Sequence, residues 1–210
     1  MRIFRELWRG KDIYRILMND ECRQYRLDGF TVDVGSGKQL ASYHRFFENK
    51  QTRIECLDLA LGNIDLETDR LPYSDDSVDT ILIMNVLEHI YNYDHLIAEL
   101  KRVLKPGGQI IGAVPFLVAY HPDPHDYWRY TKETLANIFG RYGFISIHIA
   151  PFGFGPTTAA FSQIEGVLPR LLKILFLPLV WLADECIIRL RPTLGKEKFS
   201  LGLFFRICKQ

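Results

Sequence analysis

The chain lacks several features that would assign it to a specialised class of protein. Its four cysteines form no Cys-x-x-Cys pair and follow no metal-ligand spacing, which favours buried thiols in a reducing compartment. No apolar run among the 210 residues reaches the length of a membrane-spanning helix, and the first residues are too charged for a signal peptide. A net charge of +1 gives no field that would attract nucleic acid. We therefore expect a cytoplasmic protein with no nucleic-acid partner.

The sequence does contain a regular alternation of short apolar runs and amphipathic segments. The apolar run 78–84 is nearly continuous, which is typical of a strand covered on both faces of a sheet. Strands alternating with helices at this spacing predict a doubly wound, mostly parallel sheet. Strands are predicted at 30–34, 53–57, 78–84, 109–114, 144–149 and 201–208, and helices at 11–27, 40–48, 94–104 (capped by Asp94) and 131–141 (capped by Thr131).

These elements divide the chain into four segments. We expect a helical segment at 1–29, a core at 30–152, an apolar helical insertion at 153–200 and the last core strand at 201–210. The longest uncharged run of the insertion, 174–183, has ten residues, about half of the ~20 that span a bilayer. We expect these helices to pack on the sheet or across a dimer seam. The alternative is a surface that dips into a membrane or admits a lipid-linked acceptor.

A glycine-rich turn follows the first predicted strand. The turn is Gly35-Ser36-Gly37, and an acid stands at Asp58, where the second strand ends. Glycines let a ligand approach the backbone, and an acid at the end of a strand can accept hydrogen bonds from ribose hydroxyls. Taken alone, the turn is compatible both with a nucleotide-type site and with an ordinary tight turn, so the segments downstream decide between the two.

Four segments, in order, resemble class I S-adenosylmethionine-dependent methyltransferases. They are Asp33-Val34-Gly35-Ser36-Gly37, Leu57-Asp58, the Leu-Pro-Tyr-x-Asp-Asp-Ser-Val-Asp run at 71–79, and the segment at 99–108 that ends in Leu-Lys-Pro-Gly-Gly. The run 85–89 is also similar to the family's segment after the fourth strand. The resemblance covers roughly residues 30–150. It implies a seven-stranded, Rossmann-like methyltransferase fold, methyl transfer as the activity and S-adenosylmethionine as the cofactor.

The resemblance also implies where the cofactor binds. The methionine part would lie at the glycine-rich turn, the ribose at Asp58, and the adenine at Asp65 and Leu66. Gln39 stands where the family usually has a third glycine, so its side chain narrows the pocket unless the following helix begins later. The expected cofactor-binding residues are Asp33, Gly35, Ser36, Gly37, Asp58, Leu59, Asp65, Leu66 and Asn85.

A polar and aromatic loop at 121–131 follows the strand at 109–114 and should lie at the ligand-binding edge of the sheet. We expect His125 or His89 to act as a general base, with Asp126 orienting it, and Arg129 to hold an anionic group such as a phosphate or a uronate. In the alternative interpretation the aromatic side chains pack under the sheet and Arg129 pairs with Asp126. The expected substrate-binding residues are His121, Tyr127, Trp128 and Arg129.

We expect no metal site, because Pro122 and Pro124 disfavour a helix that would present His121 and His125 on one face.

The predicted activity is methyl transfer to an acceptor that attacks the sulfonium methyl in line, so the protein mainly positions the reactants and removes a proton. We expect O-methylation of a small-molecule or sugar (glycan-precursor) acceptor, because Asp126-Tyr127-Trp128-Arg129 resembles a subfamily associated with polysaccharide biosynthesis. Two alternatives remain. One is a methyltransferase for a lipid or quinone, with a peripheral membrane or dimer contact through 167–192. The other is a non-catalytic, methyltransferase-like interaction domain. A dehydrogenase is disfavoured, because the segment 104–108 has no role in one.

Overall fold

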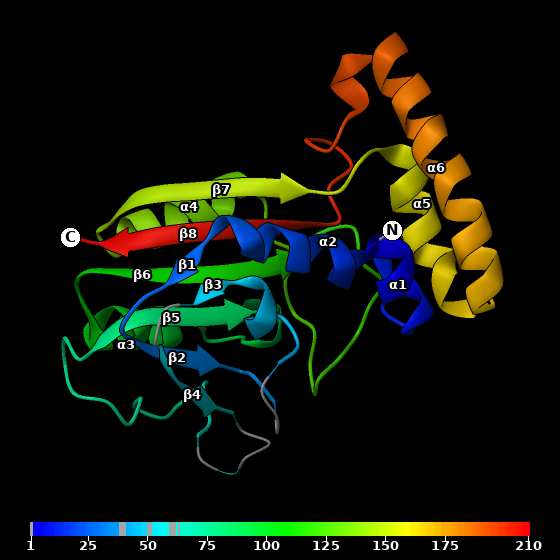
Figure 1. Cartoon of the computed structure of the whole chain (residues 1–210). Coiled ribbons are helices and arrows are strands. Elements are labelled where there is room, and N and C mark those ends of the chain that lie inside the picture. Colours follow the sequence, from blue (N-terminus) through cyan, green and yellow to red (C-terminus); the bar gives the residue numbers. More distant parts are fainter. Residues whose placement is uncertain (1, 38–40, 50–51, 59–61, 63) are drawn as a thin grey trace.

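The computed structural model describes residues 2–37, 41–49, 52–58, 62 and 64–210. Six strands in this part of the chain form one sheet (Figure 1). Strand β8 runs antiparallel to both of its neighbours, and the other five strands all run in the same direction. Their order across the sheet is β4 (Arg53–Leu57), β2 (Phe30–Val34), β5 (Val78–Met84), β6 (Leu104–Pro115), β8 (Gly202–Lys209) and β7 (Phe144–Phe152).

The predicted doubly wound, mostly parallel sheet is confirmed, but it has six strands in the described residues and not seven. The segment between β4 and β5 consists of turns and loops wherever it is described. A further parallel strand there would need two crossover connections, each of a dozen or more residues, and the segment 58–77 is too short for both. Two-residue strands β1 (Arg26–Leu27) and β3 (Glu48–Asn49) pair with each other outside the main sheet.

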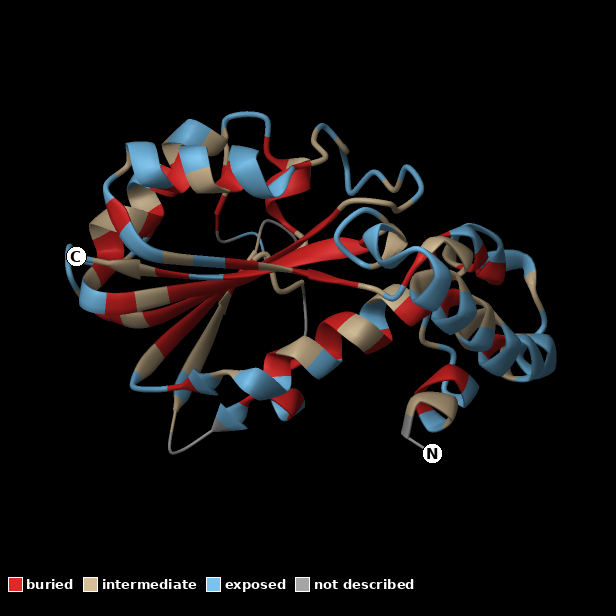
Figure 2. Ribbon diagram, turned by 90° about the horizontal axis from the view of Figure 1, so that it is seen from above, coloured by how far each residue is buried: buried red, intermediate tan, exposed pale blue. Residues whose placement is uncertain are grey.

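Helices cover both faces of this sheet (Figure 2). Alternate residues of β5 point to opposite faces: Ile81 and Ile83 pack in a cluster with α3 (Tyr93–Val103) and α4 (Lys132–Arg141), whereas Leu82 packs in a cluster with α2 (Ile13–Glu21). All three β5 residues are fully buried. The nearly continuous hydrophobicity of this strand therefore reflects a sheet with a helical layer on each side.

Three local predictions need correction. The helix expected at 40–48 is, where it is described, a turn followed by the 3₁₀ helix η2 (His44–Phe46) and β3, because tertiary contacts of this segment override its helical pattern. The helix expected at 11–27 ends at Glu21, and η1 (Cys22–Gln24) and β1 follow it. The cap of α3 is Asn92, whose side chain accepts from the His95 amide.

Asp94, the predicted cap of α3, instead accepts a hydrogen bond from the Tyr142 hydroxyl at 2.9 Å. The predicted cap of α4 is confirmed, because the Thr131 hydroxyl accepts from the Thr134 amide at 3.2 Å.

The predicted helical insertion forms α5 (Pro156–Ile164) and α6 (Arg170–Leu190), joined by η5 (Glu165–Val167), with η6 (Pro192–Leu194) after α6. With α1 (Arg2–Trp8), these helices lie beyond the carboxyl end of β6 (Figure 1). The insertion is thus an accessory layer at the carboxyl edge of the sheet.

No helix in the described ranges has both the length and the hydropathy needed to cross a membrane.

A buried carboxylate joins α5 to α6. Asp184 of α6 is 1% exposed, and it accepts hydrogen bonds from the Thr157 amide at 2.8 Å and from the Thr158 amide and hydroxyl at 2.9 and 2.6 Å. These amides belong to the first turn of α5, where a negative charge is stabilised by the helix dipole. A Cβ at Gly155 would lie 2.7 Å from Asp184 Oδ1, so this close approach requires glycine.

Replacing Asp184 with alanine should lower the free energy of unfolding by about 3 kcal/mol, because two buried donors of Thr158 and the half-buried amide of Thr157 lose their acceptor. Urea denaturation would measure this change. The matched control is Glu185→Ala, which removes the neighbouring exposed carboxylate and its 3.0 Å ion pair with Arg189. That variant should change stability by less than about 1 kcal/mol. Equal midpoints for the two variants would contradict the capping role of Asp184.

Candidate functional site

Loops that follow the carboxyl ends of the parallel strands gather at one edge of the sheet (Figure 1). They include the turn after β2, Asp58 after β4, the segment 85–89 after β5 and the loop that follows β6. Asn85 begins the third of these with a φ of 58°, and its amide donates to the Ala113 carbonyl at 2.8 Å. This is the edge at which open α/β sheets bind ligands.

The glycine-rich turn is held against the end of β4. Gly35 and Gly37 have φ angles of 74° and 76°, and a Cβ at Gly35 would overlap the side chain of Val86. The Gly35 amide donates to the Leu57 carbonyl and the Gly37 amide to Asp58 Oδ2, both at 2.7 Å. The structure therefore brings the turn and Asp58 together, and Gly35 must lack a side chain for the turn to approach the segment after β5.

Asp33 lies behind this turn and not in it. Its side chain has no exposed surface, the Tyr43 hydroxyl lies 2.8 Å from both carboxylate oxygens, and His44 Nε2 lies 2.5 Å from one of them. Burial raises the pKa of Asp33, and the hydrogen bond from His44 opposes that shift. The prediction of a direct cofactor contact needs correction, because Asp33 instead anchors the segment that follows the turn.

Of the other residues expected to bind the cofactor, Ser36 and Asp65 make local hydrogen bonds and Leu66 is buried. The Ser36 hydroxyl donates to the Gly37 carbonyl at 3.4 Å, and Asp65 accepts from the Glu67 amide at 2.9 Å. Leu66 is 7% exposed and packs in the core cluster, which leaves little of its surface for an adenine ring. Leu59 and Gln39 lie outside the described residues.

Tyr14 is a neighbour of this region that sequence reasoning missed. Its hydroxyl donates to Asn85 Oδ1 at 2.5 Å, across 71 positions of sequence. Burial raises the pKa of Tyr14 well above its ordinary value, so its hydroxyl remains a donor to Asn85. The first helical segment thus reaches the carboxyl edge, and no local sequence signal indicates that it does.

The loop at 121–130 is fastened to the 3₁₀ helix η4 (Leu87–His89) by several hydrogen bonds. The amides of Tyr127 and Trp128 both donate to the Glu88 carbonyl, at 2.7 and 3.2 Å. The Tyr130 hydroxyl donates to the Leu87 carbonyl at 3.1 Å. Trp128 Nε1 donates to the carbonyl of Ile90 at 3.0 Å. These bonds fix the loop beside the residues that follow β5.

Asp126 and Arg129 form an ion pair within this loop. The guanidinium donates to both carboxylate oxygens, at 2.5 and 2.8 Å, and the His121 amide donates to Asp126 at 2.9 Å. The Arg129 guanidinium holds the pKa of Asp126 far below its usual range. Asp126 therefore contacts Arg129 and not the His125 ring that it was expected to orient, which agrees with the ion pair of the alternative interpretation but not with its packed aromatic side chains, because Tyr127 is 43% exposed.

His125 is exposed, and its ring lies beside that of Tyr127 with 5.2 Å between centroids. The His125 main-chain carbonyl, and not its ring, contacts His89, because this carbonyl accepts a hydrogen bond from His89 Nδ1 at 2.5 Å. Of the two histidines expected as the base, His89 thus points toward the other site residues and His125 points toward solvent.

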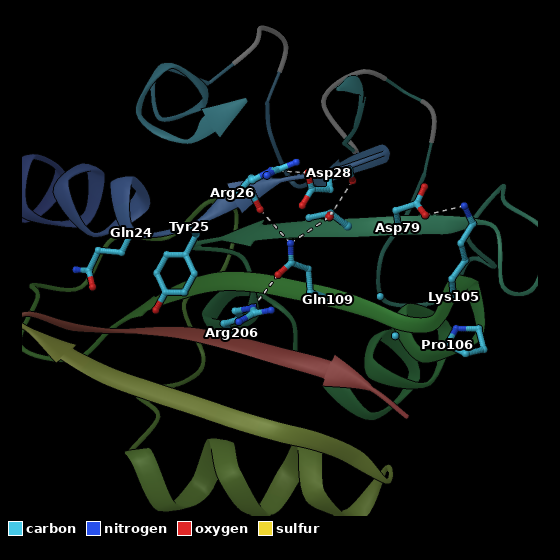
Figure 3. Close-up of a pocket in the computed structure, with 12 residues that line it drawn as sticks. Gln24, Tyr25, Arg26, Asp28, Asp79, Lys105, Pro106, Gln109 and Arg206 are labelled. Atoms are coloured by element: carbon cyan, nitrogen blue, oxygen red, sulfur yellow. Dashed lines mark hydrogen bonds and ion pairs between the residues drawn. The ribbon is translucent and has the colours of Figure 1, made fainter. Parts of the chain in front are cut away.

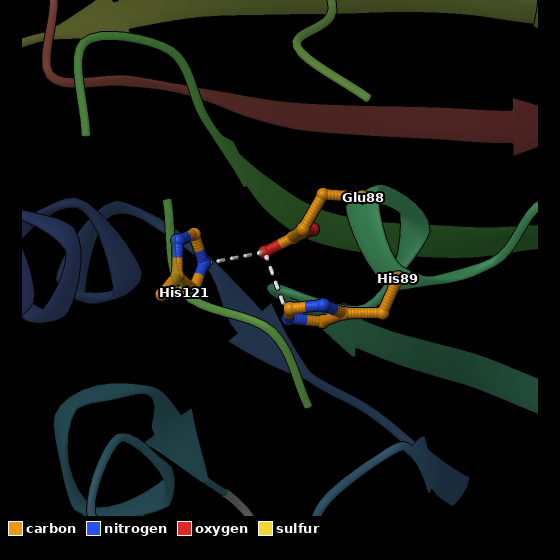
Figure 4. A group of neighbouring side chains, drawn as sticks. All are labelled: Glu88, His89 and His121. Atoms are coloured by element: carbon orange, nitrogen blue, oxygen red, sulfur yellow. Dashed lines mark ion pairs between the residues drawn. The ribbon is translucent and has the colours of Figure 1, made fainter. Parts of the chain in front are cut away.

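Glu88 completes a cluster with His89 and His121 (Figure 4). Glu88 Oε1 lies 3.7 Å from His89 Nε2 and 3.8 Å from His121 Nε2. The Glu88 side chain is fully buried, and neither oxygen has a hydrogen-bond partner among the described residues. The Glu88 carboxyl raises the pKa of His121, although burial opposes that shift. The signal that could have found Glu88 is an acid four residues after the buried strand β5, between Leu87 and His89.

A hollow of about 510 Å³ lies at the opposite edge of the sheet, beside the amino ends of β5 and β6 (Figure 3). Its polar side chains satisfy one another: Arg206 Nε donates to Gln109 Oε1 at 2.8 Å, and Lys105 pairs with Asp79 at 2.7 Å. We therefore place the candidate site at the carboxyl edge, where neither oxygen of the buried Glu88 carboxyl has a hydrogen-bond partner in the part of the chain that the structure describes.

Comparison with known proteins indicates the kind of domain that the chain contains. Residues 32–112 match the family described as Methyltransferase domain. A curated protein from Mycolicibacterium smegmatis, described as a probable S-adenosylmethionine-dependent methyltransferase, is 31% identical over 72 residues, which are 34% of this chain and 26% of that protein. The chain thus spans about a quarter of the length of the curated relative that it matches.

Solved structures establish the fold. Phosphoethanolamine N-methyltransferase 2 from Haemonchus contortus, in complex with S-adenosyl-L-methionine, aligns with a TM-score of 0.56 and 15% identity over 92% of this chain and 51% of that chain. A SAM-dependent methyltransferase from Archaeoglobus fulgidus aligns with a TM-score of 0.54 and 14% identity over 93% and 94% of the two chains. The chain has the Rossmann-like fold of class I methyltransferases.

The Glu88 carboxyl, which no hydrogen bond from the described residues reaches, should make the protein less stable than it could be. Glu88→Gln removes the buried charge, so we expect a higher Tm in a chelator-containing buffer, by about 2–4 °C for each kcal/mol relieved. Glu99→Gln is the matched control, because Glu99 accepts hydrogen bonds from Arg102 at 2.7 and 2.8 Å and should lose stability. Differential scanning calorimetry would measure both. A lower Tm for Glu88→Gln would show that its carboxyl is already compensated.

Proposed function

We propose that the chain is an S-adenosylmethionine-dependent methyltransferase. The observation that carries this proposal is the contact of the glycine-rich turn with Asp58 at the carboxyl edge of the sheet, inside the segment that matches the methyltransferase domain. The complex of the Haemonchus contortus relative with S-adenosyl-L-methionine supports the same cofactor here.

The residues around the turn fit such a cofactor. Asp58 lies at the carboxyl end of β4, where an acid can accept hydrogen bonds from ribose hydroxyls. Gly35 presents no Cβ at the point where the turn approaches Val86. When bound, S-adenosylmethionine supplies an electrophilic methyl group on a sulfonium. The protein must then hold the acceptor and take its proton.

The cluster of Glu88, His89 and His121 is suited to take that proton. His121 Nδ1 lies 2.8 Å from the Ala119 carbonyl, which can only accept, so Nδ1 carries the hydrogen and Nε2 is left with a lone pair. The Glu88 carboxyl, 3.8 Å from that Nε2, then stabilises the imidazolium that forms when Nε2 accepts a proton. A positioned base raises the reaction rate roughly 10²- to 10⁴-fold. A hydroxyl acceptor depends on such a base more than an amine acceptor does.

We propose a small-molecule or sugar acceptor, bound beside the loop at 121–130. Tyr91 and Tyr127 are 64% and 43% exposed, and their rings meet at 5.3 Å between centroids. Exposed aromatic rings offer an apolar face and a polar tip, a combination that suits a sugar ring. The resemblance of Asp126–Arg129 to a subfamily associated with polysaccharide biosynthesis supports the same acceptor class.

A lipid or quinone acceptor at a membrane surface is the second candidate. Helix α6 exposes Leu171, Leu175 and Leu182 at 69%, 62% and 61%, beside the basic residues Arg170 and Lys173. The side chain of Gln163 in α5 donates to the Leu117 carbonyl, which ties this apolar layer to the loop after β6. Flotation with anionic liposomes at low salt decides this point: protein that stays at the bottom contradicts the membrane contact and leaves a dimer seam as the use of this face.

Cofactor binding tests the proposal directly. Asp58→Ala should weaken S-adenosylmethionine binding by about 1–3 kcal/mol, or roughly 5- to 150-fold, because charged hydrogen bonds are lost. The matched control is Asp28→Ala at the opposite edge of the sheet, which should bind like the wild type. Isothermal titration calorimetry measures the affinities for S-adenosylmethionine and NAD. Binding of NAD alone would indicate a dehydrogenase, and binding of neither would indicate an interaction domain.

The proposed base should give turnover a defined pH dependence. Because His121 must be unprotonated to accept a proton, turnover should rise as the pH increases through its pKa, which Glu88 raises. In Glu88→Gln this rise should move to lower pH while the cofactor affinity stays unchanged. His121→Gln should lower turnover by up to about 10²- to 10⁴-fold. Loss of turnover in His125→Gln, with none in His121→Gln, would restore the assignment favoured by sequence alone.

A further inference from the structure

Three potential metal ligands from two separate segments converge at the carboxyl edge. Glu88 and His89 come from η4, and His121 comes from the loop after β6. Their ligand atoms all lie within 4.8 Å of one another, and both imidazole rings lie beside the same oxygen of the Glu88 carboxyl (Figure 4). This convergence depends on the hydrogen bonds that fasten the loop to η4.

Both histidines are oriented as metal-bound histidines are. His89 Nδ1 lies 2.5 Å from the His125 carbonyl, and His121 Nδ1 lies 2.8 Å from the Ala119 carbonyl. A carbonyl can only accept, so each Nδ1 carries a hydrogen and each neutral ring keeps its lone pair on Nε2. Donation of the second ring nitrogen to a backbone carbonyl is the arrangement that fixes the tautomer of metal ligands.

The environment of the Glu88 carboxyl is a second, independent observation that points to a bound cation. The side chain is fully buried, and no hydrogen bond from the described residues reaches either oxygen. Isolated buried carboxylates are costly and are normally paired or bound to a metal. A cation placed between Glu88 Oε1 and the two Nε2 atoms would satisfy the carboxyl and both lone pairs at once.

The charges around the cluster favour a cation. Arg129 is the nearest positive group, with NH2 3.5 Å from His121 Nδ1, but its charge is compensated by the ion pair with Asp126. With both imidazoles neutral, the carboxyl of Glu88 leaves the cluster with a net negative charge. His121 is 39% exposed and His89 13%, so an ion could enter from the side of His121.

We propose that Glu88, His89 and His121 bind a divalent transition-metal ion of the zinc or iron(II) class. At Zn–N and Zn–O distances of 2.0–2.2 Å, tetrahedral ligand atoms are about 3.4 Å apart. The two Glu–His separations of 3.7 and 3.8 Å therefore need to contract by only a few tenths of an ångström, and the separation of the two histidine ligand atoms, which is at most 4.8 Å, by up to about 1.4 Å. Two imidazoles and one carboxylate suit zinc or iron(II) better than magnesium or calcium, which prefer oxygen ligands.

Three protein ligands leave at least one position open for water or a ligand oxygen. A bound ion would occupy the Nε2 lone pairs, so it would replace the imidazole as the means of activating the acceptor. If the proposed methyl transfer is correct, an acceptor hydroxyl bound at the open position would lose its proton to solvent more readily, because a divalent ion lowers the pKa of a bound hydroxyl. This consequence rests on the proposed function, whereas metal binding does not. The two therefore need separate measurements.

The experiment uses the full chain, free of affinity tag and stripped with a chelator. Zn²⁺ is titrated by isothermal calorimetry, and Co²⁺ by its visible ligand-field absorption. We expect one ion per chain, with a cobalt spectrum that lacks a thiolate charge-transfer band, since all four cysteines lie outside the cluster. Mg²⁺ should not compete with Co²⁺. These readouts do not require S-adenosylmethionine or an acceptor.

Variants assign the binding to this cluster. Glu88→Gln and His121→Gln should each weaken Zn²⁺ and Co²⁺ binding by more than about 100-fold, since loss of second-shell partners alone costs 10- to 100-fold. His125→Gln, which changes a nearby exposed histidine, is the matched control and should bind like the wild type. Thermal unfolding verifies that each variant is folded. No saturable binding to the wild-type chain, or binding that survives both substitutions, would overturn the proposal.

Discussion

The arrangement of the carboxyl edge depends on the main-chain carbonyl of Glu88, which accepts hydrogen bonds from two consecutive amides, those of Tyr127 and Trp128. Together with the bond from the Tyr130 hydroxyl to Leu87, this contact holds the loop after β6 against the 3₁₀ helix after β5. Because the loop is held there, His121 lies within reach of the Glu88 side chain. The site is thus assembled by backbone hydrogen bonds between two loops that follow adjacent strands.

The same arrangement leaves a buried carboxyl group without a hydrogen bond from the described residues. Natural proteins retain such locally unfavourable groups mainly where function requires them. Other buried acids have at least one hydrogen-bonded oxygen: Asp33 is bonded to Tyr43 and His44, Asp184 caps α5, and one oxygen of Glu165 accepts from the Ile13 amide. Because both oxygens of Glu88 lack such a bond in the described residues, we infer that its partner is a substrate proton or a bound ion.

Sequence reasoning predicted the elements whose pattern is set by burial. The strand 78–84 and the helix 132–141 could be found because apolar periodicity reports a covered strand and a one-sided helix. The segment 40–48 was misjudged as a helix, because its aromatic side chains are held by long-range contacts such as the Tyr43–Asp33 hydrogen bond. Local patterns carry no information about such contacts.

The candidate site was predictable only in part, for a related reason. Gly35, Gly37 and Asp58 could be placed together because the carboxyl ends of neighbouring parallel strands meet at one edge. The partner of Asp126 was open between His125 and Arg129, and the loop geometry selects Arg129. The role of Glu88 could not be derived from the sequence, because it depends on how the loop after β6 folds back over η4.

We propose that the cofactor binds at the carboxyl edge, next to the Glu88 cluster. Backbone amide NMR of the labelled full chain, titrated with S-adenosylmethionine, would test this proposal. We expect the largest chemical-shift changes on Ser36, Gly37, Asp58 and Asn85. Changes concentrated instead around Asp79 and Gln109 at the opposite edge, or no changes at all, would contradict it.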